Sequence, residues 1–244
     1  MTDPGPPIRY EERMRLAKDH LDVGFSTGDW PAADAFWRTV VGLPYEEYLK
    51  IGAGVRQHRF GCNGSVVKVN HAREPLAPAT TVLRGLRIAH DRTAMPVRLH
   101  EPEGTPIELV PRGHDGVTGI EVSIACADGG SARRFWVDGL GGTLRPDGRV
   151  QVGDTLIRTA SEPDLTPMTA RTGPGFRYLT VQVWNCDAAH AHLLDLGFAE
   201  DLAPVTLGTT ARISFVRNDD GLPLEISQRA SLTGALPDPD GGHP

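Results

Sequence analysis

The feature that most constrains this chain is an internal repeat, because one design occurs at three places. Residues 21–43, 120–140 and 179–198 each show an alternating strand pattern, an aspartate, an amphipathic helix pattern and a glycine. The aspartate follows a fixed strand position by seven residues, as Asp29 follows Asp22. An aspartate at that point can accept hydrogen bonds from the free backbone N–H groups of a starting helix. The repeat therefore predicts a fold assembled from strand–helix modules.

A fourth unit, residues 81–112, has the strand patterns of the repeat but goes from one strand to the next without a helix pattern. We therefore expect four modules, of which the second is trimmed. Proline-rich breaks separate the modules, as expected for turns and linkers. Residues 1–18 are expected to form an N-terminal extension, and residues 231–244 a flexible tail.

Composition excludes several classes of protein. Lysine and arginine number 25 against 31 aspartate and glutamate, for a net charge of −6, and no basic stretch is interleaved with aromatics, so nucleic acid is not an expected partner. Cys62, Cys126 and Cys186 form no C-x-x-C pair, so neither a disulfide framework nor a zinc ribbon is expected, and a reducing cytoplasm fits best. The chain has no signal-peptide pattern and no run of about 18 apolar residues, so neither secretion nor membrane insertion is expected.

The sequence also lacks the motifs of several large enzyme classes. It contains no G-x-S-x-G nucleophile elbow, no Walker A loop and no H-E-x-x-H zinc motif. The glycine-rich stretch at residues 139–143 follows a helix pattern, whereas a dinucleotide fingerprint requires a strand there. The sequence therefore does not support a serine hydrolase, a nucleotide hydrolase or a nicotinamide-dependent enzyme.

Two segments share a closing pattern. Residues 100–111 (HEPEGTPIELVP) and 217–228 (RNDDGLPLEISQ) each consist of a polar turn and an alternating strand with an inward glutamate, Glu108 or Glu225. Together with the strand–aspartate–helix repeats, these segments resemble the vicinal oxygen chelate superfamily, which contains glyoxalases, bleomycin-resistance proteins and extradiol dioxygenases. The resemblance covers residues 19–230.

This resemblance implies an α+β fold in which repeated βαβββ modules form two curled mixed sheets around small-molecule pockets. Residues 19–112 are then expected to form an N-terminal module pair, and residues 117–230 a C-terminal pair. The resemblance to four-module members also implies that the C-terminal pair is the active one and that the N-terminal pair is vestigial, and the trimmed second module agrees with this.

In this superfamily, metal ligands project from the first and last strand of each module. The seven-residue spacing places four residues at the first-strand positions: Asp22, Arg84, Glu121 and Thr180. The last-strand positions hold Lys68, Glu108, Arg158 and Glu225. None is a histidine, so the two-imidazole iron site of an extradiol dioxygenase is not expected. The carboxylates at these positions suit a hard divalent ion as ligands. The adjacent lysine and arginine side chains could equally neutralise the carboxylates without an ion, so a metal site and a set of ion pairs both remain possible interpretations.

From these positions we expect Glu121 and Glu225 to be catalytic and to be the first candidates for metal ligands. In a metal-free mechanism, one glutamate would act as general base and Arg158 would stabilise the anion. The alternative metal ligands are His20, Asp22 and Glu108, because His20 lies two residues before Asp22 and is expected to share its strand face. The expected substrate pocket consists of Thr180, Gln182, Trp184, Asp22 and Glu108.

Two functions follow from the resemblance. The first is an enzyme, an isomerase, lyase or dioxygenase, that acts on a small oxygen-rich metabolite in an acidic pocket. Its cofactor would be a divalent ion (Mn, Mg, Fe, Zn or Ni) acting as a Lewis acid. The alternative is a metal-free protein that binds and sequesters a small molecule or antibiotic. In both cases the partner is a small molecule, and the chain would be a monomer or a homodimer.

Overall fold

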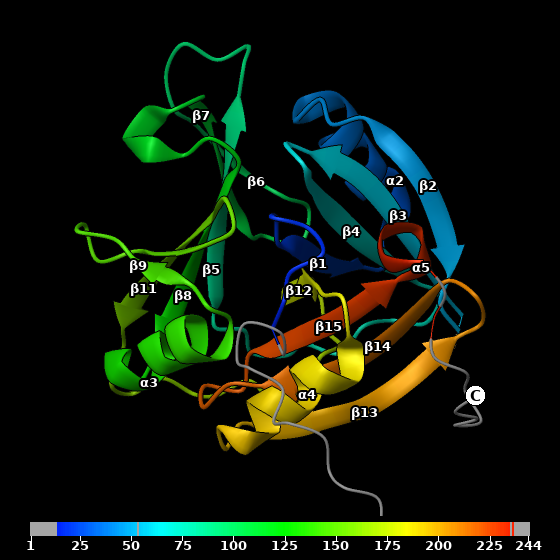
Figure 1. Cartoon of the computed structure of the whole chain (residues 1–244). Coiled ribbons are helices and arrows are strands. Elements are labelled where there is room, and N and C mark those ends of the chain that lie inside the picture. The colour runs from blue at the N-terminus through cyan, green and yellow to red at the C-terminus, as the bar shows by residue number, and fades with distance from the viewer. Residues whose placement is uncertain (1–13, 53, 235, 237–244) are drawn as a thin grey trace, which may run out of the picture.

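The computed structural model describes residues 14–52, 54–234 and 236, and its strands form two curved sheets (Figure 1). The eight-stranded sheet has the order β13-β14-β15-β12-β1-β4-β3-β2. Its strands are β1 (Asp22–Thr27), β2 (Tyr45–Lys50), β3 (Val55–Cys62), β4 (Ser65–Ala72), β12 (Gly175–Gln182), β13 (Ala199–Leu207), β14 (Ala211–Arg217) and β15 (Pro223–Arg229).

The seven-stranded sheet has the order β6-β7-β5-β8-β11-β10-β9. Its strands are β5 (Leu83–His90), β6 (Val97–His100), β7 (Pro106–Pro111), β8 (Ile120–Cys126), β9 (Thr143–Leu144), β10 (Val150–Val152) and β11 (Thr155–Ser161). Both sheets contain parallel and antiparallel pairs, so the predicted α+β class with two mixed sheets is confirmed. In the described part of the chain, the second module has no helix between β5 and β6, as its sequence predicts.

The modules share sheets in a different combination from the one expected. β1 pairs antiparallel with β12, and β5 pairs antiparallel with β8. The first module therefore shares a sheet with the fourth, and the second with the third, whereas chain order suggested pairs over residues 19–112 and 117–230. The first strands of the modules have similar alternating patterns, so the sequence alone does not distinguish between these combinations.

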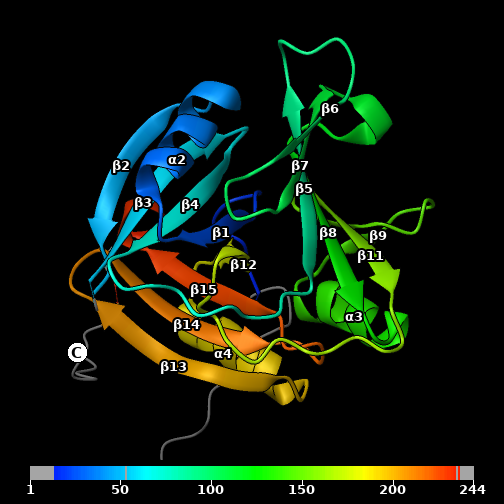
Figure 2. The same cartoon turned by 180° about the vertical axis from the view of Figure 1, so that it is seen from behind.

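Each helical module begins its helix at the predicted aspartate or close to it. Asp29 caps α2 (Trp30–Asp34), and Asp128 caps α3 (Gly129–Arg134), each through a side-chain oxygen that accepts a backbone N–H. In the fourth module Asn185 is the cap of α4 (Cys186–Asp195), and the predicted Asp187 lies in its first turn. α4 packs against β13, β14 and β15, as the view from behind also shows (Figure 2).

The helices of the first and third modules each continue as one π-helical turn, η1 (Ala35–Val40) and η3 (Phe135–Gly139). Phe36 and Trp37 in η1 are 8% and 1% exposed, and Phe135 and Trp136 are fully buried, so both aromatic pairs belong to the core. Val40, the last residue of η1, is 55% exposed.

Apolar side chains from both sheets and the helices form one continuous core. Phe25 of β1 stacks on Phe176 of β12 with ring centroids 4.6 Å apart, and it contacts Trp37 at 5.0 Å. The strands alternate, so the polar residues of each strand lie on the sheet face opposite the core, as Thr180 and Gln182 do on β12. Each of the two sheets thus has one polar face, and these two faces carry most of the residues predicted to form the site.

The expected N-terminal extension and C-terminal tail lie mostly outside the described residues. Of the expected tail, residues 231–233 belong to a short helix, α5 (Ala230–Thr233). Among the described residues, no helix has the length and apolar character needed to cross a bilayer.

Candidate functional site

Seven of the eight residues predicted at the ligand positions, all except Arg84, fall into two groups, one on each sheet. On the eight-stranded sheet, the Lys68 cluster consists of Asp22, Lys68, Thr180 and Glu225. On the seven-stranded sheet, the Glu121 cluster consists of the predicted Glu108, Glu121 and Arg158, together with Arg87 and Arg149, which contact Glu121. Strand register brings each group together, since Asp22 pairs with Thr180 and Thr180 with Glu225, while Arg87 pairs with both Glu121 and Glu108.

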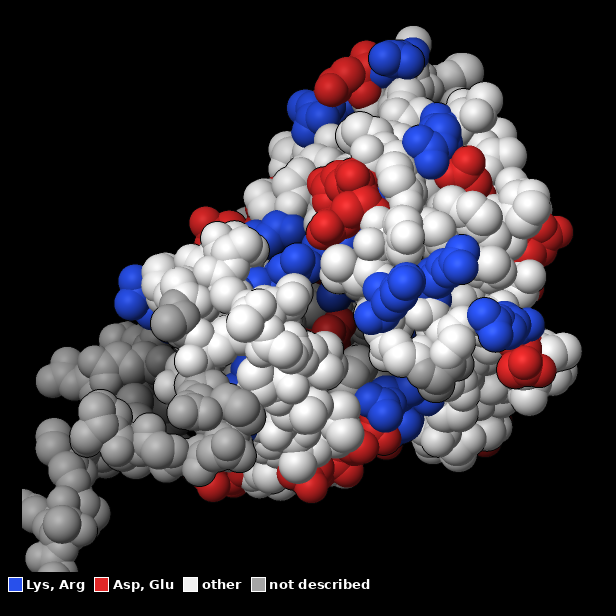
Figure 3. All heavy atoms as spheres, turned by 90° about the vertical axis from the view of Figure 1, so that its right-hand side faces the viewer, with Lys and Arg blue, Asp and Glu red and all other residues white. Residues whose placement is uncertain are grey.

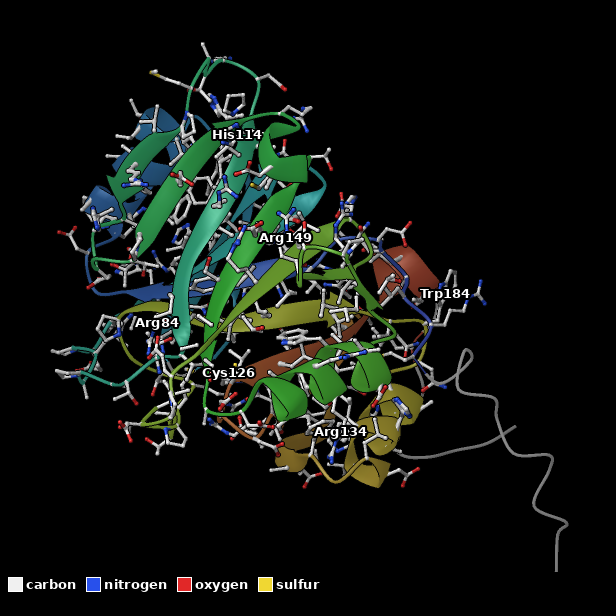
Figure 4. All side chains as sticks on the ribbon, turned by 90° about the vertical axis from the view of Figure 1, so that its left-hand side faces the viewer. Arg84, His114, Cys126, Arg134, Arg149 and Trp184 are labelled. Carbon is white, nitrogen blue, oxygen red and sulfur yellow. The ribbon has the colours of Figure 1, made fainter. Side chains whose placement is uncertain are left out.

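The first-strand position of the second module is Arg87, and the prediction of Arg84 is wrong. Arg87 pairs with Glu121 as Asp22 pairs with Thr180. Arg84 forms an exposed ion pair with Glu162 near the other end of β5 (Figure 4). The seven-residue spacing fails here because this module has no helix for the aspartate to begin.

Three side chains of the Lys68 cluster form a closed triangle of hydrogen bonds. Lys68 Nζ donates to Thr180 Oγ1 at 2.8 Å and to Glu225 Oε2 at 2.8 Å. Thr180 Oγ1 donates to Glu225 Oε2 at 2.7 Å. All three residues are buried, with at most 8% of their surface exposed. A buried ammonium thus lies directly against a buried carboxylate, which is the arrangement that compensates both charges.

Asp22, the fourth member, is held as a carboxylate by several donors. It accepts bonds from Lys18 Nζ at 2.6 Å, the Val66 backbone N–H at 2.8 Å and Gln182 Nε2 at 3.1 Å. Burial by itself would raise the pKa of Asp22, but Lys68 and Lys18 outweigh it, so the pKa of Asp22 is lowered. The predicted pocket residues Asp22, Thr180 and Gln182 therefore lie together.

Neutral polar side chains extend the Lys68 cluster across the same sheet face. The Tyr178 hydroxyl accepts bonds from Gln57 Nε2 at 3.2 Å and Asn70 Nδ2 at 3.1 Å. Burial raises the pKa of Tyr178, so its hydroxyl stays protonated. The ring lies over Gly24, where a Cβ atom would come within 2.2 Å of it. Gly24 is thus required for the Tyr178 ring to occupy this position.

The donor set of the Lys68 cluster does not fit a resident divalent metal ion. The ammonium of Lys68 fills the position between Thr180 and Glu225 that a bound cation would take, and a second cation there would be repelled. The Asp22 oxygens are already used by Lys18, Gln182 and the backbone. Across the described residues, no three histidine, cysteine, aspartate or glutamate side chains converge in a metal-binding geometry.

The Glu121 cluster is saturated with guanidinium groups. Arg158 Nε donates to Glu121 Oε1 at 2.9 Å, Arg87 Nη1 lies 3.3 Å from the same oxygen, and Arg149 binds Oε2. Figure 4 shows Arg149 beside the strands of this sheet. Burial opposes ionisation of the fully buried Glu121, but bonds from Arg158 and Arg149 outweigh it and lower the pKa of Glu121. Glu108 is bound by Arg87 at 2.8 Å.

Several predicted site residues lie apart from one another. Glu121 and Glu225 are in different sheets, so the structure does not bring the two expected catalytic glutamates together. Trp184 is 39% exposed, stacks under the Arg15 guanidinium at 4.7 Å and points away from the molecule (Figure 4). His20 does not share the Asp22 face; it lies before β1 and pairs with Asp154 at 2.6 Å.

Sequence reasoning missed further residues that face the Lys68 cluster. These are Lys18, Glu47, Gln57, Arg59, Asn70, Tyr178 and Arg229. Alternation in the β3 sequence VRQHRFGC was the available signal, because it places Gln57 and Arg59 on one face beside Asn70 and Lys68.

A separate cavity of about 450 Å³ near the β3–β4 turn is lined by none of the Lys68 cluster residues.

No family model matches the sequence, and no curated protein matches it either. Solved structures do match. Glyoxalase I from Zea mays has a TM-score of 0.67 and 14% identity, covering 86% of this chain and 92% of that one. A mutant of the same enzyme has a TM-score of 0.71 and 14% identity over 90% of this chain and 97% of that one. A putative dioxygenase from Bacillus subtilis has a TM-score of 0.62 and 13% identity over 88% and 85%.

Proposed function

Because this chain has the fold of the vicinal oxygen chelate superfamily, we propose that it is an enzyme acting on a small oxygen-containing metabolite at the Lys68 cluster. The observation that carries the proposal is the contact of Lys68, Thr180 and Glu225 at first-strand and last-strand positions of the paired modules. Structural ion pairs alone do not require a threonine hydroxyl and a row of neutral amides beside them. These neutral groups offer hydrogen bonds to a polar substrate beside the ion pair.

The chemistry that this arrangement supports is proton transfer next to a carbonyl group. Glu225 takes the proton from the substrate carbon, and the resulting enolate oxygen is stabilised by the Lys68 ammonium. Lys68 has three N–H donors, of which two are directed at Thr180 and Glu225, so one remains for the substrate oxygen. Return of the proton from Glu225 to a different substrate atom completes an isomerisation without an oxidant or a reductant.

We assign no step to a metal ion, because the Lys68 ammonium supplies the positive charge at the position where the superfamily resemblance implies a ligand set. The activity is therefore expected to persist in a chelator. Protein purified without chelators is expected to contain far less than one equivalent of Mn, Fe, Zn or Ni by plasma mass spectrometry. Stoichiometric metal, lost in Glu225→Ala, would contradict this part of the proposal.

Hydrogen–deuterium exchange tests the proton transfer directly. Short 2-oxo acids, hydroxyketones and branched acyl thioesters are incubated with the protein in deuterated water, and exchange next to the carbonyl is followed by NMR. We expect at least one class to exchange, and Glu225→Gln to slow exchange by about 100-fold or more. Lys68→Met is expected to slow it as well, because the enolate loses its cation.

Glu108→Gln is the matched control, since Glu108 holds the corresponding last-strand position on the other sheet. It is expected to leave exchange unchanged. Equal loss in Glu108→Gln and Glu225→Gln would mean that the Lys68 cluster is not the reaction centre. Tight binding of a panel member without any exchange would instead support the ligand-sequestering alternative.

A further inference from the structure

The buried Arg59 and the half-buried Arg229 lie at the rim of the Lys68 cluster, and among the described residues Glu47 is the one acidic residue that contacts both. Arg59 Nε is 3.5 Å from Glu47 Oε1, and Arg229 Nη2 is 3.7 Å from the same oxygen. Both distances exceed those of a charge-assisted hydrogen bond. The Arg59 side chain is 7% exposed and that of Arg229 is 17% exposed, and Arg59 Nε has no hydrogen-bond partner within the described structure.

Curvature of the eight-stranded sheet brings these residues together. Strands β12, β1, β4 and β3 lie between β15, which carries Arg229, and β2, which carries Glu47. The contact between Arg229 and Glu47 therefore closes the curled sheet above the Lys68 cluster. The face of the molecule on the side of β2 and α5 is hollowed near its centre, and basic side chains gather around the hollow (Figure 3).

The charges around this rim do not balance. The cations whose contacts meet on this face are Lys18, Lys68, Arg59 and Arg229. The anions are Asp22, Glu225 and Glu47, so positive charges outnumber negative ones by four to three. Burial and the nearby Arg59 lower the pKa of Arg229, in agreement with a shortage of negative charge. Poorly compensated buried guanidinium groups are costly unless an anion binds them.

We propose that the carboxylate of a short oxo acid binds between Arg59 and Arg229, at the position that the Glu47 carboxylate partly fills. The proposal rests on the proposed function, for which it names the substrate class. Arg59 lies directly opposite Lys68 in the β3–β4 register, so their Cβ atoms are about 5 Å apart. A carboxylate at Arg59 then places a carbonyl one or two carbons away near Lys68 and Glu225. Short 2-oxo and 3-oxo acids have this spacing.

Calorimetric titration at constant ionic strength tests the site. The probes are 2-oxopropanoate, 3-oxobutanoate, neutral butanedione and inorganic phosphate. We expect the oxo acids to bind more tightly than butanedione, and Arg59→Met and Arg229→Met each to raise Kd about tenfold or more. Arg98→Met is the matched control, because Arg98 is 89% exposed on the other sheet.

Glu47→Gln gives the readout that a purely structural role would not produce. It removes the internal competitor, so Kd for the oxo acids is expected to fall by about fivefold to tenfold. An unchanged or higher Kd in Glu47→Gln overturns the proposal. Phosphate binding that equals or exceeds oxo acid binding also overturns it, because the site would then recognise any oxyanion.

Glu225→Gln separates this inference from the proposed function. The variant should bind the oxo acids at least as tightly as the wild type but fail to exchange their protons. Tight arginine-dependent binding with full exchange in Glu225→Gln would overturn the proposed proton transfer and leave the carboxylate site standing.

Discussion

The two sheets carry related clusters built in opposite ways. The Glu121 cluster surrounds one buried carboxylate with three arginines, so every acceptor position of Glu121 is used by a cation. The Lys68 cluster places one ammonium against Glu225 and Thr180, with neutral side chains such as Tyr178 and Asn70 beside it. Equivalent positions have thus become a structural ion network on one sheet and a site with spare hydrogen-bonding capacity on the other.

This difference teaches that position in the fold does not by itself identify the active half. Chain order and the trimmed second module suggested that the C-terminal modules act as a pair. The structure instead divides the fourth module from the third, and the more open polar cluster lies where the first and fourth modules meet. The bonding state of each cluster is what separates a stabilising role from a chemical one.

The largest expected effect is on stability, and it belongs to the Glu121 cluster. Glu121→Gln leaves Arg87, Arg149 and Arg158 without their shared anion, so we expect the free energy of unfolding to fall by about 3 kcal/mol in urea denaturation. Glu225→Gln removes the counter-charge of a single buried cation, Lys68, which keeps Asp22 nearby and an amide oxygen as acceptor, so we expect a smaller loss of about 2 kcal/mol. A loss of stability in Glu225→Gln that exceeds the loss in Glu121→Gln would contradict this comparison of the two clusters.

A packing change tests the neutral part of the Lys68 cluster. Gly24→Ala places a methyl group within 2.2 Å of the Tyr178 ring, so the ring must move and the bonds to its hydroxyl must weaken. We expect a loss of about 2 kcal/mol in thermal or urea unfolding. Gly28→Ala is the control, because no atom lies within 4 Å of its added methyl group. Equal stability of the two variants would show that Tyr178 is not fixed by Gly24.

Acid sensitivity is expected to arise partly from the eight-stranded half. Burial, together with the nearby His71, lowers the pKa of His58 from 6.5 to about 4, and the ring stacks on Trp30 at 3.4 Å. The unfolded chain therefore binds a proton at His58 at a higher pH than the folded chain does. Stability from this group is complete above pH 6.5 and is lost as the pH falls toward 4.

Urea denaturation at several pH values between 4 and 7 measures this effect. His58→Gln should be less stable overall because stacking is lost, but its stability should depend less on pH across that range. The same pH slope in the variant and the wild type would assign the acid sensitivity to other groups.

The smallest effect is expected at the exposed edge of the Glu121 cluster. Arg98 lies 3.3 Å from Glu108, but its side chain is 89% exposed, so solvent screens the pair. Arg98→Met should change the free energy of unfolding by less than about 0.5 kcal/mol. A loss above 1 kcal/mol would extend the structural network to the surface.

Much of the local structure follows from the sequence. Alternation and helix-capping aspartates located the strands and helices, and the seven-residue spacing placed Asp22, Glu121 and Thr180 correctly within their sheets. It failed for Arg84, where no helix anchors the spacing.

The site was only partly predictable, because its remaining members meet through sheet curvature. Arg229 and Glu47 are distant in the chain and in strand order, so no local pattern indicates their contact. His20 was misplaced for a related reason, since strand alternation begins only at Asp22. Packing of the whole core decides which strands pair in a sheet. The modules have similar alternating patterns, so the sequence does not distinguish one set of partners from another.

The pairing of the first and last modules has a consequence for synthesis on the ribosome. The strands of the seven-stranded sheet are contiguous in the chain, so this sheet can pair as soon as β11 has emerged. β1 through β4 are made first but find their partner β12 only much later, and Glu225 joins Lys68 only after β15 is translated. The part of the chain that is made first therefore waits longest for its partner strands, and the Lys68 cluster is among the last features of the protein to form.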